Sequence, residues 1–352
     1  MFVLRPAVHA DLPQIERMAT QSAIGITSLP PDRAKLVEKI ERSIASFSVE
    51  IDVPGEETYF FVLENTESGE LAGTSGIAAS AGFHDRFYSY RNEIIVHASQ
   101  DLKVSNKIHA LHLCHDLTGY SLLTSFFIDP ALAESHLPQL LSRARLLFIA
   151  EHRRRFADKL AAENPGVCDA EGRSPFWDAV GRRFFNMAYP QAERLSGGRS
   201  RTFIAELMPQ YPIYVPLLPA SAQLAIGQLH PDGELPFSIL LDEGFDPDTY
   251  IDIFDGGPTV EARLSTLATM RHQQRATWRG DSAAVSVESI VANTTLSNFR
   301  AALGAISLDG RSAGGSAKLA ELLALNPGDA LRHVPLMIER RDVDTAEMGA
   351  GA

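Results

Sequence analysis

Several side chains that could bind a metal lie close together near the middle of the chain, at His109, His112, Cys114 and His115. If this segment is helical, His109 and His112 share one face, as two metal ligands would. No carboxylate follows in the arrangement typical of zinc proteases. A metal-dependent hydrolase would require stoichiometric metal in the purified protein. Packing and hydrogen bonding are therefore the favoured interpretation of this histidine run.

Another histidine and two aspartates occupy loop-like segments further along the chain. His230 stands in the run GQLHP, and an imidazole exchanges protons near neutral pH, so it could serve as a general acid or base. The alternative is a loop histidine that caps the turn before Pro231. Asp252 and Asp255, in YIDIFDGGPT, could bind a guanidinium, whose planar fork suits carboxylates. Equally, both could cap a turn.

These residues need elements to position them, and the pattern predicts a mixed α and β chain. Residues 122–128 read as an apolar strand that passes through Asp129 and Pro130 into an amphipathic helix at 139–156. Asp11 is expected to cap a helix that begins at Leu12. Residues 83–118 read as a long functional connection. The other expected elements are strands at 2–7, 59–64, 71–80 and 159–163, and helices at 33–47, from Ser174, and at 316–323.

Charge and composition limit the possible partners. The chain has 352 residues, of which 45% are hydrophobic, and a formal net charge of −12. This acidic balance argues against nucleic-acid binding, which requires a basic footprint. The first residues lack an uninterrupted apolar segment, so neither secretion nor a membrane partner is expected. Two cysteines, Cys114 and Cys168, are too few for a disulfide framework, and we expect a cytoplasmic location.

Longer motifs carry a family resemblance. The runs ITSLP, YFFVLE, VHAS, DLTG, SPFWDAVGRRFF, FIAELMP, GQLHP and YIDIFDGGPT follow one another from residue 26 to residue 259. In this order they resemble the arginine N-succinyltransferase family, and IHALHLCHDLTG and SLLTSFFID are most similar to the alpha subunit of its two-subunit arginine/ornithine enzyme. The resemblance implies an α+β, GCN5-related N-acyltransferase fold with a splayed mixed sheet. It also implies an acyltransferase-like core at 1–189, an extension completing the acceptor site at 190–270, and a small β-rich tail at 271–352 with a disordered C-terminus.

The same resemblance implies a function. A succinyl group would pass from succinyl-CoA, the cosubstrate, to the α-amino group of arginine or ornithine, in arginine catabolism and together with a beta subunit. His230 matches the family's general acid/base, and Phe126, Phe127 and Ile128 occupy the strand that contacts succinyl-CoA. Phe126, Phe127 and Ile128 would fit a buried core strand equally well. Asp116 is a weaker substrate-binding candidate, with Asp252 and Asp255. No metal is expected.

One segment departs from the family pattern. Relatives follow Asp-Pro with an arginine and a glycine-rich turn, because close backbone approach to a pyrophosphate needs residues without bulk. Here the run is ALAESHLPQ, with Ala133 in place of the arginine and Glu134 adding a negative charge. Pro138 starts the helix but lacks an N–H. We therefore expect weak or absent binding of the cofactor here, and a noncatalytic structural or regulatory partner of a catalytic beta subunit stays open. Arg143 and Arg145 are interpreted as solvated helix residues, with phosphate contact as the alternative.

Overall fold

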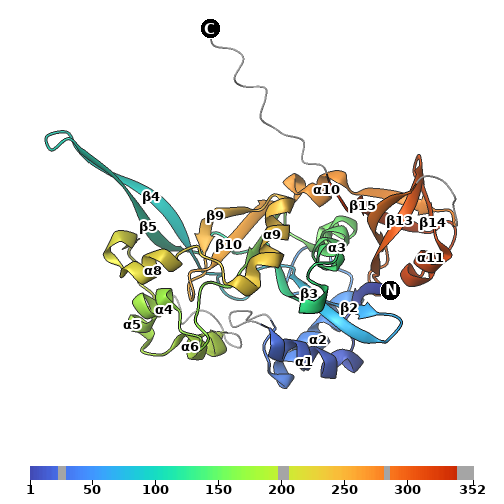
Figure 1. Cartoon of the computed structure of the whole chain (residues 1–352), viewed down its shortest axis with the longest axis horizontal. Helices are drawn as coiled ribbons and strands as arrows, with labels where there is room; N and C mark the ends of the chain where they lie inside the picture. Colours follow the sequence, from blue (N-terminus) through green and yellow to red (C-terminus); the bar gives the residue numbers. More distant parts are fainter. Residues whose placement is uncertain (23–28, 197–205, 281–285, 339–352) are drawn as a thin grey trace, which may run out of the picture.

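One mixed sheet organises the chain in the computed structural model, which describes residues 1–22, 29–196, 206–280 and 286–338. Helices cover both faces of its central part, and the sheet spans the long axis of the molecule (Figure 1). The predicted α+β class is confirmed. Within the described residues the strands follow the order β12-β15-β11-β14-β13-β1-β2-β3-β6-β7-β10-β9-β4-β5-β8.

The bounds of the described elements are as follows. The strands are β1 (Phe2–Pro6), β2 (Thr58–Asn65), β3 (Glu70–Ala78), β4 (Ser89–Ser99), β5 (Val104–Cys114), β6 (Ser121–Ile128), β7 (Lys159–Glu163), β8 (Ile213–Tyr214), β9 (Asp246–Ile251), β10 (Pro258–Arg263), β11 (Gln274–Trp278), β12 (Val287–Asn293), β13 (Ala301–Asp309), β14 (Ser312–Gly315) and β15 (Ala330–Pro335). The α-helices are α1 (Leu12–Gln21), α2 (Arg33–Ser48), α3 (Leu137–Glu151), α4 (Pro175–Ala179), α5 (Gly181–Phe185), α6 (Tyr189–Ser196), α8 (Ala220–Ala225), α9 (Glu234–Glu243), α10 (Ala268–His272) and α11 (Ala317–Leu323).

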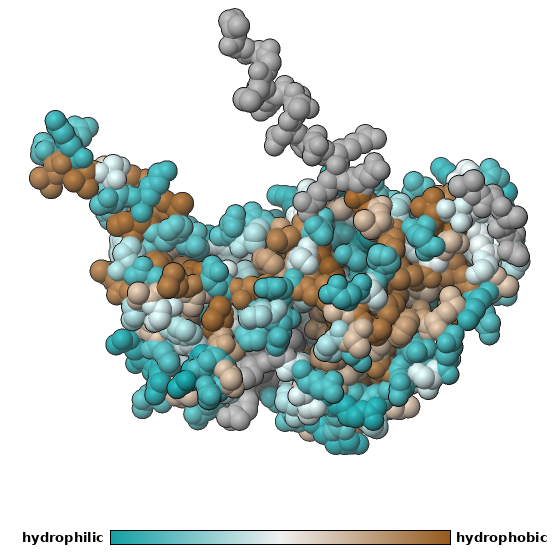
Figure 2. Space-filling view, viewed as in Figure 1, coloured by the Kyte–Doolittle hydropathy of each residue, from teal (hydrophilic) through white to brown (hydrophobic). Residues whose placement is uncertain are grey.

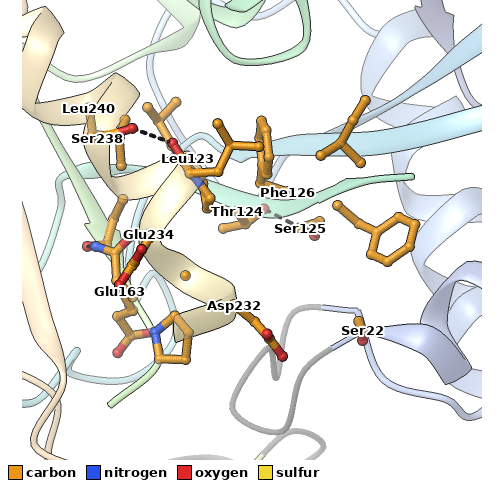
Figure 3. Close-up of a pocket in the computed structure, with 18 of the residues that line it drawn as sticks. Ser22, Leu123, Thr124, Ser125, Phe126, Glu163, Asp232, Glu234, Ser238 and Leu240 are labelled. Carbon is orange, nitrogen blue, oxygen red and sulfur yellow. Dashed lines mark hydrogen bonds between the residues drawn. The ribbon is translucent and has the colours of Figure 1, made fainter. Parts of the chain in front are cut away.

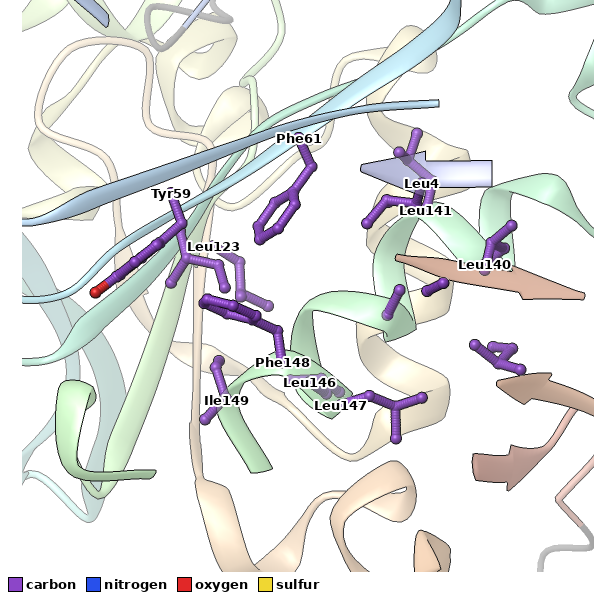
Figure 4. Packing of buried hydrophobic residues seen from close by; sticks show 14 of the residues in the cluster. Leu4, Tyr59, Phe61, Leu123, Leu140, Leu141, Leu146, Leu147, Phe148 and Ile149 are labelled. Atoms are coloured by element: carbon purple, nitrogen blue, oxygen red, sulfur yellow. The ribbon is translucent and has the colours of Figure 1, made fainter. Parts of the chain in front are cut away.

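Strand β2 lies at the centre of the core because both of its faces are apolar. Successive side chains of a strand point to opposite faces. Phe60 and Val62 pack with α1 and α2, whereas Tyr59 and Phe61 pack with α3. The rings of Tyr59 and Phe61 lie 5.1 and 5.3 Å from the ring of Phe148 on α3 (Figure 4). Each such buried side chain contributes roughly 1.5–3 kcal/mol of transfer free energy, so this sandwich holds the helices in place.

Most local predictions for the first half are confirmed. The strands expected at 59–64 and 71–80 form the antiparallel hairpin of β2 and β3. Ser174 caps α4 by accepting a hydrogen bond from Trp177 N–H. The predicted Asp11 cap is wrong, because its carboxylate instead accepts hydrogen bonds from the Arg5 guanidinium and from Val8 N–H. A charged donor outcompetes the amides of the first helical turn.

The segment expected to be a long connection is a β-hairpin. Strands β4 and β5 pair along their whole length, from Ser89 opposite Cys114 to Ser99 opposite Val104. The hairpin projects from the body as an arm (Figure 1), and apolar and polar surface interleave along it (Figure 2). The sequence concealed these strands because their outer half is exposed on both faces, so no alternation of apolar and polar residues marks it.

The interpretation of the α3 arginines as solvated is also wrong. Arg143 and Arg145 are each 3% exposed, and Arg155, just after the helix, is 6% exposed. Helix α3 lies between the main sheet, the C-terminal strands and α9, so it has no solvent face along most of its length. Its arginines are therefore core residues.

The C-terminal strands close on themselves. Because β12 pairs with β13 as well as with β15, strands β11 to β15 form a closed ring in which each strand pairs with two neighbours. Helix α11 packs Leu319 and Leu322 into its interior. The ring joins the main sheet where Ala301 of β13 pairs with Leu4 of β1. The predicted domain limits remain a prediction, and residues 339–352, at the end of the tail whose C-terminus is predicted to be disordered, lie outside the described residues.

No helix among the described residues is long and apolar enough to cross a membrane.

Candidate active site

A cavity of about 700 Å³ opens where two neighbouring parallel strands separate. Strands β6 and β7 pair only at Ser121 with Leu160 and at Leu122 with Ala161. Beyond these pairs the strands diverge, and the cavity lies between them (Figure 3). Its walls come from β6, from the end of β7, from the segment that opens α9, and from the end of α1, with lining residues that include Leu122–Ile128, Ala162–Pro165, Pro231–Pro236 and Ser22.

A bulge in β6 contributes to the cavity wall. Gly76 pairs with Thr124 and Thr74 pairs with Phe127, so Ser125 and Phe126 both face the single residue between them on β3. Ser125 has a φ of 55°, an uncommon conformation for a residue other than glycine. The Thr74 hydroxyl donates a 2.8 Å hydrogen bond to the Ser125 carbonyl, which holds the bulge. A bulge re-aims side chains and is frequent beside active sites.

His230 directly precedes the segment that forms the third wall. Its backbone N–H donates to the Pro165 carbonyl at 2.8 Å, which ties it to the end of β7. Its ring Nδ1 accepts a hydrogen bond from Asp232 N–H at 3.2 Å, and the side chain is 19% exposed. The turn-capping interpretation therefore describes the contact that His230 makes. Its catalytic role stays a prediction, with Pro231 and Asp232 next to it in the cavity wall.

The cavity has opposite charges on different walls. Arg145 reaches it from α3, with its guanidinium carbon 5.8 Å from the centroid of the Phe126 ring. Glu163, Asp232 and Glu234 line it as well, and Figure 3 shows Glu163 and Glu234 on the side away from Ser22. Such a cavity suits a ligand, or a pair of ligands, that carries both an anionic and a cationic group.

The predicted site residues fall into two groups. Phe126, Phe127 and Ile128 line the cavity, whereas His230, which directly precedes the lining residue Pro231, and Asp116, Asp252 and Asp255 do not. Asp116 accepts hydrogen bonds from Arg91 Nη1 at 2.6 Å and from the Tyr250 hydroxyl at 3.3 Å. Burial and this carboxylate both raise the pKa of Tyr250, so its hydroxyl stays protonated as a donor.

Asp252 and Asp255 stabilise a turn, in line with the turn-capping alternative to guanidinium binding. Asp252 accepts from the backbone N–H groups of Phe254 and Asp255, at 2.6 and 3.1 Å. Asp255 is buried and accepts from Gly166 N–H and Gly257 N–H, each at 2.8 Å. The carboxylate oxygens of both residues are thus already engaged by backbone N–H groups. Substrate binding by either residue stays an untested prediction.

The loop between β6 and α3 uses its backbone donors internally. Ala131 N–H donates to the Asp129 carboxylate, and the N–H groups of residues 132, 133 and 135 donate to backbone carbonyls within the loop. Leu137 N–H donates to the Ser135 hydroxyl at 3.2 Å. Pro138 lies in the first turn of α3, as predicted. Most of the amides that would bind a pyrophosphate are thus already engaged, which adds a structural reason for weak cofactor binding here.

The helical premise of the metal interpretation is wrong, because His109 and His112 lie on strand β5. Residues three apart on a strand point to opposite faces. His109 bonds to Asn92 at 3.0 Å, and His112 Nε2 lies 3.4 Å from a Glu93 carboxylate oxygen. Within the described ranges no group of three or more histidine, cysteine or acidic side chains is placed to hold a metal ion.

Sequence reasoning did not place the four charged residues of the cavity wall, of which Arg145 is the most informative. It lies in the run LLSRARLLFIA, where apolar residues occur on all sides of the helix. A helix that is apolar all round is buried, and its few polar residues are then buried with it. That pattern was the available signal. The acidic residues Glu163, Asp232 and Glu234 had no comparable signal, because their strands and turns meet only in the folded chain.

The fold is that of an α+β protein in which two parallel strands separate around a cavity, with His230 next to two residues of its wall. Comparisons with known proteins agree on a family. The protein-family model described as "Arginine N-succinyltransferase beta subunit" matches residues 2–269. The family model of its C-terminal domain matches residues 274–335. The chain belongs to the arginine N-succinyltransferase family, acyltransferases of arginine catabolism, and the predicted family is confirmed.

Individual relatives cover nearly the whole chain. The arginine N-succinyltransferase subunit alpha of Pseudomonas aeruginosa is 51% identical over 338 residues, which are 95% of this chain and 99% of that protein. An arginine N-succinyltransferase of Salmonella paratyphi B is 39% identical over 97% of this chain and all of its own length. A solved structure, that of arginine/ornithine succinyltransferase subunit AI from Pseudomonas aeruginosa, superposes with a TM-score of 0.87 at 47% identity. The match covers 96% of this chain and 99% of that one.

Proposed function

We propose that this chain is the alpha-type subunit of a cytoplasmic arginine or ornithine N-succinyltransferase with a GCN5-related acyltransferase fold. It works with a homologous beta subunit and uses succinyl-CoA as the acyl donor. The cavity between the diverging strands β6 and β7, with His230 beside it, carries this proposal. A gap between parallel strands admits an extended ligand that can hydrogen-bond to strand backbone on either side.

The chemistry requires an amine to attack a thioester. The new N–C bond forms as the C–S bond breaks, and the proton lost by the amine must reach the CoA thiolate. Because His230 Nδ1 accepts from Asp232 N–H, the neutral ring carries its hydrogen on Nε2. That Nε2–H donates a hydrogen bond to the oxyanion or the departing thiolate, while the proton lost by the amine reaches the thiolate through solvent. One positioned donor to a developing oxyanion contributes about 10²- to 10³-fold in rate.

The cavity wall divides the two substrates. The bulged strand β6 presents Phe126 and the backbone near Ser125 to the acyl group. The acidic residues Glu163, Asp232 and Glu234 favour a cationic acceptor, such as the side chain of arginine or ornithine. Holding both reactants in one cavity converts a bimolecular encounter into a positioned reaction.

A second candidate function rests on one observation, the engaged amides of the loop between β6 and α3. With most of the donors for a pyrophosphate engaged, and with Glu134 in the same loop, the chain binds succinyl-CoA weakly by itself. It would then stabilise or regulate a catalytic beta subunit while keeping the family fold.

Thiol release from succinyl-CoA with arginine and with ornithine separates the two functions. The assay uses the chain alone, the chain with its beta partner, and His230→Ala in both settings. His272→Ala is the matched control, because His272 is exposed and bonds to the Ala268 carbonyl on a short helix. If His230→Ala loses turnover while His272→Ala keeps it, the chain contains a working site. Full activity of the complex after His230→Ala makes the chain a noncatalytic subunit.

A further inference from the structure

Arg145 is a charged side chain in the cavity wall with an incomplete set of partners. It is 3% exposed, and both of its hydrogen bonds go to Ser142, one turn earlier on α3. These bonds use Nε and Nη2, whereas a guanidinium has five N–H donors in a fixed fork. Its guanidinium carbon lies over the ring of Phe126, 5.8 Å from the ring centroid, and Phe126 also lines the cavity. The side chain is thus held at the cavity with donors to spare.

The neighbouring arginines show what a structural arginine looks like in this protein. Arg143 pairs with the Glu243 carboxylate at 3.0 Å and donates to the Leu336 and Pro335 carbonyls. Arg155 donates to the Ser46 and Val49 carbonyls and to the Tyr59 hydroxyl. By contrast, no carboxylate of the described residues lies within 4.0 Å of Arg145. Burial lowers the pKa of Arg145 to about 9, which still leaves it charged at neutral pH.

A buried charge without a counter-ion is costly, so an anion that reaches the cavity gains strongly from pairing with it. The position of Arg145 distinguishes between the anions of an acyl-CoA. It lies nine residues after His136 at the start of α3, and therefore about 13 Å along the helix from the end where a pyrophosphate would bind. It contacts Phe126, on the strand that faces the acyl group in the proposed function, on which this inference rests.

We propose that the buried guanidinium of Arg145 binds the terminal carboxylate of the succinyl group and so selects a dicarboxylic acyl donor over a neutral one. Phe126 packs against the guanidinium from one side, and Ser142 fixes two of its donors. The remaining donors form charge-assisted hydrogen bonds to the carboxylate. The acidic residues of the cavity repel that carboxylate from the acceptor side, which orients the donor.

The test compares two donors that differ only at the proposed contact, succinyl-CoA and butyryl-CoA, in which a methyl group replaces the carboxylate. The assembled enzyme is assayed with wild-type chain, Arg145→Met and Arg145→Lys. We expect Arg145→Met to lower kcat/KM for succinyl-CoA by about 10- to 100-fold, the range for hydrogen bonds to charged groups. The value for butyryl-CoA should stay unchanged, and Arg145→Lys should retain part of the preference. An equal loss for both donors, or no loss, overturns the proposal.

Two further measurements complete the test. One distinguishes the acyl carboxylate from a CoA phosphate, and the other applies if the variant does not fold. Inhibition by free CoA, which has phosphates but no acyl carboxylate, should be unaffected by Arg145→Met. A parallel weakening assigns Arg145 to a phosphate and overturns the proposal. If Arg145→Met does not fold, succinate should still raise the thermal midpoint of the wild-type chain while neutral succinamide does not. The thermal midpoint can be measured even if the wild-type enzyme shows no turnover. Absent turnover would reject the proposed function but not the carboxylate-binding role of Arg145.

Discussion

Arg143 on α3 and Glu243 at the end of α9 form a buried ion pair, with Nε 3.0 Å from Oε1 and both side chains 4% exposed. Thr269 on α10 donates to the same carboxylate through its hydroxyl and its N–H, at 2.6 and 2.7 Å. The other Arg143 donors reach the carbonyls of Pro335 and Leu336. The ion pair therefore joins α3, which follows strand β6, to α9, which lines the opposite side of the cavity. The Arg143 bonds through Nη1 and Nη2 tie α3 to the end of strand β15.

Breaking this pair should be expensive. Glu243→Gln leaves the Arg143 charge buried without a counter-ion, and removing one partner of such a pair costs about 3–5 kcal/mol of the free energy of unfolding. Urea unfolding followed by circular dichroism measures the loss. Asp309→Asn is the control, because Asp309 pairs with Arg279 at 3.0 Å with both side chains exposed, and should cost less than about 1 kcal/mol. Similar small losses for both variants would show that the buried pair is not a structural requirement.

Stability should fall as the solution is acidified through the pH range in which one half-buried histidine, His152, takes up a proton. Burial against Phe148, with ring centroids 4.7 Å apart, lowers the pKa of His152 to about 4. The unfolded chain takes up this proton near pH 6.5, so between pH 6.5 and 4 it binds more protons than the folded chain. The stabilisation is complete above about pH 6.5 and declines as pH falls toward 4, by at most about 1.4 kcal/mol per pH unit.

A neutral replacement isolates this contribution from the carboxylates that titrate in the same range. His152→Gln should unfold with a shallower pH dependence than wild type between pH 6.5 and 4, and with the same dependence above pH 7. His333, buried at 2% exposure with its pKa also lowered by burial, should give a slope of the same sign. Identical slopes for wild type and His152→Gln would mean that His152 titrates normally in the folded chain.

Gly73 on β3 sets how closely the bulged strand approaches. A Cβ at this position would lie 2.6 Å from the Phe127 carbonyl oxygen and 3.0 Å from Leu141 Cδ2. Gly73→Ala should therefore cost roughly 1–3 kcal/mol through overpacking and displace the cavity wall. Thermal unfolding and turnover of the assembled enzyme check both effects. Gly69→Asn, at a turn with φ of +73° and nothing within 4 Å, should change neither, and an inert Gly73→Ala would contradict the tight approach.

Restoring donors to the loop before α3 should strengthen cofactor binding. The variant Ala133→Arg, Glu134→Gly, Ser135→Gly adds a cation, removes an anion and frees the Leu137 N–H from the Ser135 hydroxyl. We expect succinyl-CoA to bind the isolated chain at least about tenfold more tightly, a gain of about 1.4 kcal/mol, measured by calorimetry. The single variant Ala133→Ser serves as control. An unchanged affinity would show that the loop does not limit binding in this subunit.

Local patterns predicted many elements because their signals lie within a few residues. The stripe of Leu36 and Ile40 on α2, the hairpin of β2 and β3, and the strand ending at Ile128 each follow from spacing alone. The arm of β4 and β5 could not be predicted this way, because exposed strands lack the alternation that burial imposes. Asp11 shows the same limit on a smaller scale, since its carboxylate prefers the Arg5 guanidinium to the amides of α1.

The sequence by itself determined the family, the cavity strand through Phe126 and the departure of the loop at Ala133, because each is written in a contiguous run of residues. Only the tertiary structure decided that Arg145 is buried in a cavity wall while Arg143, two residues earlier, is neutralised by Glu243. Two residues apart, they point to different sides of the helix. The partners of Arg143 come from segments about a hundred residues away or more, whereas among the described residues Arg145 bonds only to Ser142 on its own helix. The physical reason is that desolvation and charge pairing depend on what packs against a side chain, and α3 is enclosed only when the later strands and α9 fold around it.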